Sequence, residues 1–333
     1  MKKILQYLFE HKTLSREKAR EVLTHIAKGM YNESEITAFI TVFLMRSITI
    51  DELQGFRDAL LDLCVRVDLN GHDTIDIVGT GGDGKNTFNI STLACFIVAG
   101  TGQKVSKHGN YGASSISGAS NVMEQLGYTF KNDAGRLRQE VETAGICFLH
   151  APLFHPALKT VGPIRKNLGI RTFFNMLGPM VNPAFPRFQL IGVYNLEMAR
   201  VYNYMLQQQG EALFTIIHAL DGYDEISLTG DTKVITNRGE RIMTPEELGK
   251  RMVNASDIYG GNTVEEAAKI FLKILKVEGS WAQNAVVLAN AAMALHSTGA
   301  YLRYDDAYAA AVESLESGRA YECLTKLIAL QVK

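Results

Sequence analysis

The first 66 residues of the chain repeat apolar side chains at spacings of three and four, which places them on one face of a helix. Within this stretch Gly29 is a stop signal, and Thr49 with Glu52 forms the T-x-x-E start signal of a capping box. The pattern predicts helices over residues 2–9, 18–27, 35–45 and 52–63. These helices together predict a small helical domain.

The pattern changes at Asp73, after which short β-rich runs alternate with helical runs. The predicted strands lie within residues 74–82, 104–110, 146–152, 188–195 and 213–220. The predicted helices lie within residues 91–100, 119–127, 133–144 and 197–208, with mostly helix from 263 onwards. This alternation predicts an α/β fold with a central, mostly parallel sheet and helices on both faces. Residues 225–255 look like a β-containing excursion, in which Thr244 and Glu247 open another helix.

Composition excludes several classes of protein. The 34 basic residues nearly balance the 35 acidic ones, which argues against the clustered positive charge of a nucleic-acid interface. No apolar run approaches the roughly 18 residues of a membrane span, and the N-terminal stretch reads as an amphipathic helix instead of a signal peptide. The four cysteines are far apart and form no C-x-x-C pair, so we expect a reduced, cytoplasmic protein.

A glycine-rich loop, GTGGDGKN over residues 79–86, follows the first predicted strand. It satisfies G-x-G-x-x-G, but no acid stands near residues 104–107, where a dinucleotide-binding fold needs one. It also nearly matches a P-loop, but Asn86 stands where the Mg²⁺-binding hydroxyl is required. Both nucleotide motifs therefore fail, and a plain tight turn stays an alternative.

The residues after this loop favour an anion. Asn89, Ser91 and Thr92 supply an amide and two hydroxyls at a predicted helix start, where N–H groups and the helix dipole attract negative charge. Residues 84–123 contain no Asp or Glu, although they include three lysines. A buried glycine-rich region would also explain this, but we favour a pocket kept free of negative charge for a ligand with several phosphates.

A second loop, KHGNYGASS over residues 107–115, leaves another predicted strand and is dense in hydrogen-bond donors. Glycine lets a backbone approach a ligand closely, and Lys107 offers a compact charge to phosphate. A lone histidine such as His108 is more often structural than catalytic. This loop therefore strengthens the prediction of a phosphate site without naming a catalytic residue.

An acidic turn, DGYDE over residues 221–225, follows the strand predicted at 213–220. Ligands of open α/β sheets bind beyond the carboxyl ends of strands, so these carboxylates could hold Mg²⁺ through hard oxygen ligands. An ordinary solvated turn is the alternative. A polyphosphate pocket with a diphosphate leaving group favours the metal.

Arg165 lies in a segment that starts at His155 and ends in an apolar, aromatic stretch at 172–183. Pro163, Pro179 and Pro183 are expected to break this segment into bent pieces. A guanidinium beside such a segment suits a flat aromatic acid, because it can pair bidentately with a carboxylate. A surface arginine on a helix is an alternative that spacing alone leaves open.

Taken together, these motifs resemble the anthranilate phosphoribosyltransferase family, in order and spacing, over nearly the whole chain. They are GTGGDGKNTFNIST (79–92), KHGN (107–110), HPALKTVGPIRKNLGIRTFFNMLGP (155–179) and DGYDE (221–225). The resemblance implies a helical domain of residues 1–69, joined by a returning segment near 160–180, and an α/β domain of residues 70–333. It also implies a fold similar to the pyrimidine nucleoside phosphorylases and a homodimer formed through the helical domain.

The family's reaction joins anthranilate to phosphoribosyl pyrophosphate (PRPP) in tryptophan biosynthesis. The neutral aniline nitrogen can attack C1 of PRPP without a strong base, so we assign no nucleophile and no acid–base residue. Catalysis is expected from positioning and from Mg²⁺, with two ions per site implied, which neutralises the departing pyrophosphate.

The resemblance also implies site residues of three kinds. PRPP contacts are expected from Gly79, Gly82, Asp83, Thr87, Asn89, Ile90, Ser91, Thr92, Lys107, His108, Gly109, Asn110, Tyr111, Gly112, Ala113, Ser114, Ser115 and Ala119. Anthranilate contacts are expected from Gly79, Asn110 and Arg165, with His108, His155 and Pro179 lining the path. Metal contacts are expected from Ser91, Asp224 and Glu225.

The second loop departs from the family pattern at three positions. The family usually has Arg where Tyr111 stands, a basic residue where Ile116 stands, and Ser where Ala119 stands. Ala119 cannot donate a hydroxyl, and the neighbouring Ser120 is a candidate substitute.

Two other functions stay open at this point. A pyrimidine nucleoside phosphorylase of similar fold would need a nucleobase site in place of the Arg165 carboxylate site. A non-catalytic nucleotide-binding regulator could use the same two glycine loops.

Overall fold

The computed structural model describes residues 1–112, 116–208, 210 and 213–332 of the chain. The chain divides into two compact units. The helical unit contains Met1–Val67 and Ala151–Pro183, and the α/β unit contains Asp68–His150 and Ala184–Lys333. Among the residues described, no helix combines the length and apolar character that crossing a membrane requires.

The helical unit contains the four helices predicted at the start of the chain and two later ones. Its elements are α1 (Lys2–Phe9), α2 (Arg16–Ala27), α3 (Glu33–Met45), α4 (Ile50–Leu63), α8 (Ala151–Phe154), α9 (Pro156–Leu168), and the 3₁₀ turns η1 (Phe173–Met176) and η2 (Gly178–Met180). The predicted helices are confirmed, but α2, α3 and α4 each begin two residues earlier than predicted, because Ser15, Asn32 and Thr49 cap them. Their core includes a cluster of phenylalanine rings from α3, α4 and η1.

The expectation that Pro163 breaks its segment is wrong, because Pro163 lies inside α9. A proline inside a helix loses one N–H donor and its ring crowds the carbonyl of the preceding turn, but the buried Val161 and Ile164 hold α9 in place on either side of it.

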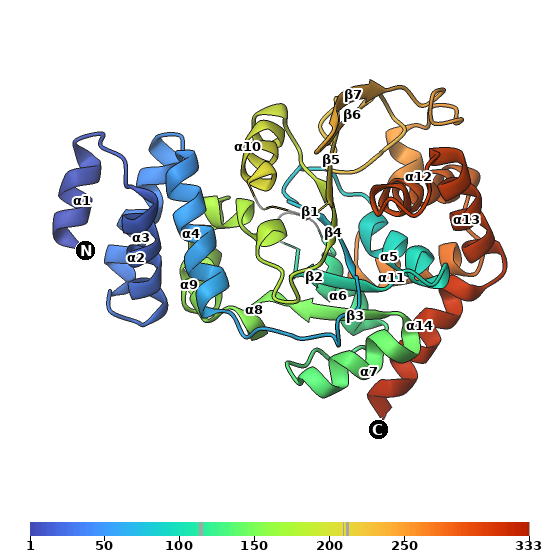
Figure 1. Ribbon diagram of the computed structural model, residues 1–333, viewed down its shortest axis with the longest axis horizontal. Coiled ribbons are helices and arrows are strands. Elements are labelled where there is room, and N and C mark those ends of the chain that lie inside the picture. The colour runs from blue at the N-terminus through green and yellow to red at the C-terminus, as the bar shows by residue number, and fades with distance from the viewer. Residues whose placement is uncertain (113–115, 209, 211–212, 333) are drawn as a thin grey trace. The chain divides into compact units, whose positions relative to one another are not determined.

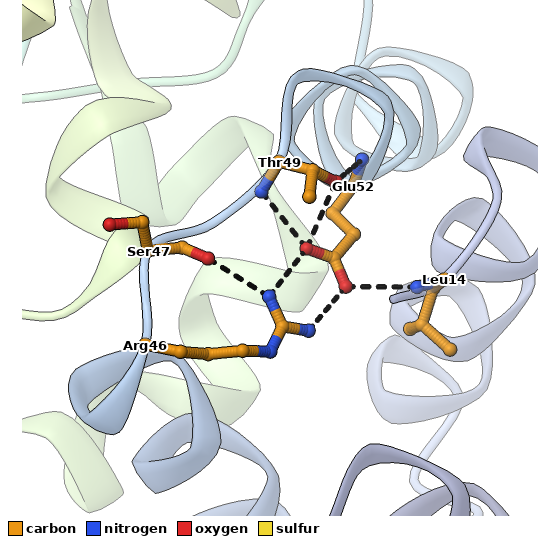
Figure 2. A network of polar contacts seen from close by, with 5 residues as sticks. All are labelled: Leu14, Arg46, Ser47, Thr49 and Glu52. Carbon is orange, nitrogen blue, oxygen red and sulfur yellow. Dashed lines mark hydrogen bonds and ion pairs between the residues drawn. The ribbon is translucent and has the colours of Figure 1, made fainter. Parts of the chain in front are cut away.

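A buried charge network holds the capped start of α4 (Figure 2). The carboxylate of Glu52 accepts hydrogen bonds from the backbone N–H groups of Leu14 at 2.9 Å and Thr49 at 3.0 Å, and pairs with both terminal nitrogens of Arg46 at 2.6 and 2.9 Å. Burial raises the pKa of Glu52, but the bonds from Arg46, Leu14 and Thr49 outweigh it, and the net pKa is lowered. The network therefore needs an ionised Glu52.

Replacing Glu52 with alanine is expected to destabilise the protein by about 3 kcal/mol, because the mostly buried Arg46 guanidinium would lose its partner. Urea unfolding measures this loss, with the exposed Glu33→Ala at the start of α3 as control, expected to cost at most about 1 kcal/mol. Because the folded pKa of Glu52 lies below its ordinary 4.5, the contribution is present above pH 4.5 and is lost as pH falls through the folded pKa. Equal losses of unfolding free energy in Glu52→Ala and Glu33→Ala would show that the network does not stabilise the fold.

The α/β unit is built on a seven-stranded sheet, within the described part of the chain, in the order β3-β2-β1-β4-β5-β6-β7. The strands are β1 (Ile75–Gly79), β2 (Val105–Gly109), β3 (Ile146–His150), β4 (Phe188–Gly192), β5 (Leu213–Ala219), β6 (Thr232–Thr236) and β7 (Gly239–Met243). The first five strands in this order, β3, β2, β1, β4 and β5, pair in parallel. Strands β6 and β7 are antiparallel and form one edge of the sheet. The predicted mostly parallel sheet is confirmed.

Helices cover both faces of this sheet. They are α5 (Ile90–Gly100), α6 (Ala119–Gln125), α7 (Ala134–Ala144), α10 (Leu196–Gln207), α11 (Val264–Leu275), α12 (Trp281–Ser297), α13 (Tyr304–Glu316) and α14 (Arg319–Ala329), with the short turns η3 (Ala255–Ile258) and η4 (Leu330–Val332). Helices α5 and α12 pack together on one face, and α10 contacts β5 and β6 from the other (Figure 1). Almost all of α12 is buried, which makes it the central helix of this unit's core.

The predicted helix start at Thr244 is wrong. Thr244 and Glu247 do exchange the two bonds of a capping box, at 2.9 and 3.2 Å, but the residues form only a turn. Gly249 follows with φ +69°, a left-handed conformation that ends the turn before a helix can grow.

Candidate functional site

Three strands end in glycine at the carboxyl edge of the parallel sheet. Gly79 of β1 is paired with Gly192 of β4, and Gly109 ends β2. A Cβ on Gly79 would lie 2.4 Å from Oδ2 of Asp224, and one on Gly192 would lie 1.5 Å from the Asp224 carbonyl oxygen. Glycine at both positions is therefore what lets the acidic turn after β5 lie against the ends of β1 and β4.

The first glycine loop bends back on this acidic turn. Gly81, Gly82 and Gly84 have φ values of +64°, +77° and +74°, which favour glycine. The N–H of Gly81 donates to Oδ2 of Asp224 at 2.7 Å. The side chain of Asp83 accepts the N–H of Lys85 at 2.9 Å. The predicted PRPP contacts Gly82 and Asp83 therefore lie in a loop that this local hydrogen bond helps to hold in shape.

The start of α5 meets the same acidic turn. The backbone N–H of Ser91, free in an isolated helix, donates to Oε1 of Glu225 at 2.9 Å. Asn89 precedes the helix and donates its side-chain amide to the Ser117 carbonyl at 2.9 Å, which links the start of α5 to the residues between the second loop and α6. Ile90 and Thr92 are buried in the first turn. The structure therefore brings Ser91 and Glu225 together.

Asp224 and Glu225 are 7% and 8% exposed, so two adjacent carboxylates lie buried. Burial raises the pKa of Asp224, and burial together with the charge of Asp224 raises the pKa of Glu225 well above its ordinary value. Lys107 acts in the opposite direction on both, which places its charge near the pair. Such a pair is more easily ionised beside a cation.

The residues present fit Mg²⁺ that arrives with a phosphate ligand. Mg²⁺ is usually held by one or two carboxylates, with substrate phosphates and waters completing the coordination. Asp224 and Glu225 supply two carboxylates, and nowhere among the described residues do three or more His, Cys, Asp or Glu side chains gather to hold a metal alone. The arrangement therefore suits a Mg²⁺ ion that is coordinated jointly by these carboxylates and the phosphates of a ligand.

The second loop begins inside the sheet. Lys107 is buried, and its ammonium donates to the Ile77 carbonyl of β1 at 2.6 Å. His108 is also buried, and its backbone N–H donates to Oδ1 of Asp76 at 3.2 Å. Both residues at the start of this loop, Lys107 and His108, are thus fixed to the neighbouring strand, and His108 as a whole is only 2% exposed.

Beyond β2 the second loop is tied to α6. Asn110 accepts the N–H of Ser120 through its carbonyl at 3.2 Å, and the N–H of Gly112 donates to Asn121 at 3.0 Å. Of the predicted contacts here, Ala113, Ser114 and Ser115 lie outside the described residues, and Ala119 is the first residue of α6.

The structure does not support Ser120 as the substitute for the hydroxyl missing at Ala119. Ser120 is only 2% exposed, and its Oγ lies 2.9 Å from Nδ1 of His150 on β3. Its hydroxyl is therefore already used in a buried hydrogen bond within the α/β unit.

The predicted anthranilate residues Arg165, His155 and Pro179 lie in the helical unit. Arg165 on α9 donates from Nη2 to Oδ1 of Asn175 at 3.1 Å, and its guanidinium lies 5.6 Å from the centre of the Phe174 ring. Its Nε is buried and has no hydrogen-bond partner within the described ranges. Burial lowers the pKa of Arg165, but a guanidinium stays charged at neutral pH.

His155 and Pro179 are both buried. Burial lowers the pKa of His155 to about 4, so its imidazole is neutral at pH 7. Their roles along an anthranilate path stay predictions.

Sequence reasoning missed two groups of residues that hold the site. Asn290, buried on α12, accepts the N–H of Ile226 at 3.0 Å and donates to its carbonyl at 2.8 Å, directly after Glu225. The segment 258–260 pairs with the first loop, where the N–H of Gly260 donates to the Asn86 carbonyl at 2.7 Å. The only sequence signal for Asn290 is an amide within the apolar run at 285–295 of α12.

Two family models together match most of the chain. The model described as glycosyl transferase family, a/b domain, matches residues 71–321. The model described as glycosyl transferase family, helical bundle domain, matches residues 2–64.

Curated relatives match over nearly their full length. The chain is 59% identical to an anthranilate phosphoribosyltransferase of Flavobacterium johnsoniae over 98% of both proteins. It is 55% identical to one of Bacteroides fragilis over 99% of both.

Solved structures of the same enzyme share the fold. The chain is similar to anthranilate phosphoribosyltransferase from Thermus thermophilus with a TM-score of 0.90 and 31% identity, covering 99% of both chains. It is similar to the Saccharomyces cerevisiae enzyme in complex with PRPP and Mg with a TM-score of 0.88 and 28% identity, covering 96% of this chain and 94% of that one. With relatives above half identity along its whole length, the chain belongs to the anthranilate phosphoribosyltransferase family.

Proposed function

We propose that the carboxyl edge of the parallel sheet binds PRPP and that the chain transfers its phosphoribosyl group to the amine of anthranilate. The products are N-(5-phosphoribosyl)anthranilate and pyrophosphate, as in the tryptophan-biosynthesis step of the family. One observation carries the proposal: two glycine loops and the start of α5 meet a buried acidic pair, Asp224 and Glu225.

The loops offer PRPP what a multiply charged anion needs. Backbone N–H groups of a glycine loop and of a helix start bind phosphate oxygens without large side chains in the way. The solved structure of the yeast relative in complex with PRPP and Mg supports this assignment. The PRPP contacts implied by the resemblance stay part of the proposal.

Ser91, Asp224 and Glu225 are the proposed protein ligands of Mg²⁺, with two ions per site. When bound, Mg²⁺ supplies positive charge that stabilises the departing pyrophosphate. The protein's part is to hold both carboxylates in place: the N–H groups of Gly81 and Ser91 fix one oxygen of each. We propose that Mg²⁺ binds to the carboxylates held in this way.

The transfer itself needs little from side-chain chemistry. The aniline lone pair of anthranilate forms a bond to C1 of the ribose while the bond from C1 to pyrophosphate breaks, with inversion at C1. The nitrogen, now positively charged, then releases one proton to give the amine of the product. Positioning is then the protein's main contribution. Asn110 and Gly79 are proposed to contact anthranilate, and Arg165 to bind its carboxylate. The structure of a yeast relative in complex with 4-fluoroanthranilate supports an anthranilate-type acceptor.

One assay tests the proposal. Protein with PRPP, Mg²⁺ and anthranilate should consume anthranilate, which is followed by the loss of its fluorescence. Turnover that instead requires phosphate and a pyrimidine nucleoside would identify a phosphorylase. PRPP binding without turnover of any acceptor would identify a regulator and refute the proposal.

We also propose that the chain acts in the cytoplasm as a homodimer formed through the helical unit. All four cysteines, each within the described residues, are free thiols, which suits a reducing compartment. A hollow of about 370 Å³ between α1 and α3 has mostly apolar walls, and two of the residues that line it are strongly exposed, Met45 at 82% and Phe9 at 62%.

Met45→Glu is expected to convert the dimer into a monomer in analytical ultracentrifugation, because a charge would be buried in the interface. The matched control is Met252→Glu, at an exposed methionine of the α/β unit, which should stay dimeric. The same oligomeric state in both variants would contradict the assignment of this face.

A further inference from the structure

The second loop is held at both ends by side chains of the α/β unit itself. Asn121, on the first turns of α6, accepts the N–H groups of Gly112 and Gly118 on one oxygen, each at 3.0 Å. A Cβ on Gly118 would lie 2.2 Å from the nitrogen of Gly112, so the two ends of the loop lie in contact. One amide side chain thus closes the base of the loop.

Tyr111 adds a second attachment near the start of this loop. Its hydroxyl donates to Oε1 of Glu124 on α6 at 2.7 Å. Its ring meets the ring of His150 edge-on, with centroids 4.8 Å apart. Tyr111 is 44% exposed, so it lies on the surface while both of its contacts point back into the unit.

His150 gives Tyr111 a rigid partner. Its ring stacks on Phe130 with centroids 4.8 Å apart, and its Nδ1 lies 2.9 Å from the buried hydroxyl of Ser120. The imidazole is therefore fixed from two sides before Tyr111 packs against it. The fixed ring of His150 can therefore hold the ring of Tyr111 in place.

We propose that Tyr111 is a positioning residue for PRPP, which sets the backbone of residues 110–112 through Glu124 and His150 before the ligand binds. The inference rests on the proposed function, because it assigns a purpose to a loop proposed to contact PRPP. Asn110 lies next to Tyr111, and its side-chain oxygen accepts the Tyr111 N–H at 2.8 Å. Fixing Tyr111 therefore also fixes the direction of Asn110.

The consequence is a selective effect on PRPP. Residues 110–112 are held before the ligand binds and therefore lose little conformational freedom on binding, so this part of the ordering cost is removed from the binding step. Loss of the Tyr111–Glu124 bond should raise the KM for PRPP by about three- to tenfold, close to the net worth of one ordinary hydrogen bond, because the Glu124 carboxylate is exposed to water. The kcat should stay within about twofold of the wild type, and the KM for anthranilate, which Asn110 is also proposed to contact, should rise by a smaller factor than the KM for PRPP.

The test is a set of matched variants. Tyr111→Phe keeps the ring contact and removes the hydroxyl, Glu124→Ala removes the acceptor, and Glu124→Gln keeps an acceptor oxygen. The first two, and their double variant, should raise the PRPP KM by the same factor, because all three lack one and the same bond. Glu124→Gln should rescue the affinity, and Tyr204→Phe, at an exposed tyrosine on α10, is the control.

Hydrogen exchange of the ligand-free protein separates this inference from the proposed function. Deuterium uptake by a peptide covering residues 105–125 should be faster in Tyr111→Phe than in the wild type and in Glu124→Gln. If the wild type does not turn over PRPP and anthranilate, the proposed function fails and the uptake alone decides on the positioning role. Equal uptake, an unchanged PRPP KM in Tyr111→Phe, or additive losses in the double variant would each overturn it.

Discussion

Replacing Asp224 with asparagine and Glu225 with glutamine together is expected to lower kcat by at least about a hundredfold. The substitutions keep the size of both side chains and an oxygen that can accept the N–H groups of Gly81 and Ser91. They remove the charge that would hold Mg²⁺ beside the pyrophosphate. The fold should survive, because the folded protein no longer has to hold two buried carboxylates side by side.

Steady-state turnover over a range of Mg²⁺ concentrations measures this effect. Thermal unfolding in the presence of PRPP gives a second readout: added Mg²⁺ should raise the Tm of the wild type and leave the double variant almost unchanged. Asp221→Asn is the matched control, because Asp221 lies in the same turn but is exposed, with its carboxylate bound to the hydroxyl of Thr229. A folded double variant with near-normal Mg²⁺-dependent kcat would remove the acidic pair from the mechanism.

Local signals in the sequence predicted most of the fold. Helix starts were readable because capping residues such as Thr49 and Glu52 act within a few residues of one another. The same signal failed at Thr244 and Glu247, where the capping bonds form but Gly249 ends the turn. A capping pair predicts where a helix can start, but the residues after it decide whether one forms.

The site was predictable as a set of segments and not as a set of contacts. Glycine loops and an acidic turn are visible in the sequence, and strand order brings their ends to one edge of a sheet. The bonds that fix them span large separations, such as the amide of Asn290 on Ile226, and leave no local pattern. For the same reason spacing could not show that Ser120 bonds His150 instead of serving at the position of Ala119.

Arg165→Ala is expected to raise the KM for anthranilate about ten- to a hundredfold and to change the KM for PRPP much less. The expected size follows from a charge-assisted hydrogen bond to a carboxylate, which is worth roughly 1.5–3 kcal/mol. The guanidinium is prepared for this role: Nη2 is held by Asn175, the Phe174 ring lies beside it, and the buried Nε has no partner within the described part of the chain. Arg165→Lys should recover only part of the affinity, because an ammonium keeps the charge but lacks the planar fork that matches a carboxylate.

The comparison with aniline isolates the carboxylate contact from every other effect of the substitution. Aniline carries the attacking nitrogen but no carboxylate, so its kcat/KM should be nearly the same in the wild type and in Arg165→Ala. A loss of folding or a displaced α9 would instead lower activity with both acceptors and raise the KM of both substrates. If anthranilate and aniline lose equally, Arg165 does not bind the carboxylate, and the preference for anthranilate over other aromatic amines must come from elsewhere in the chain.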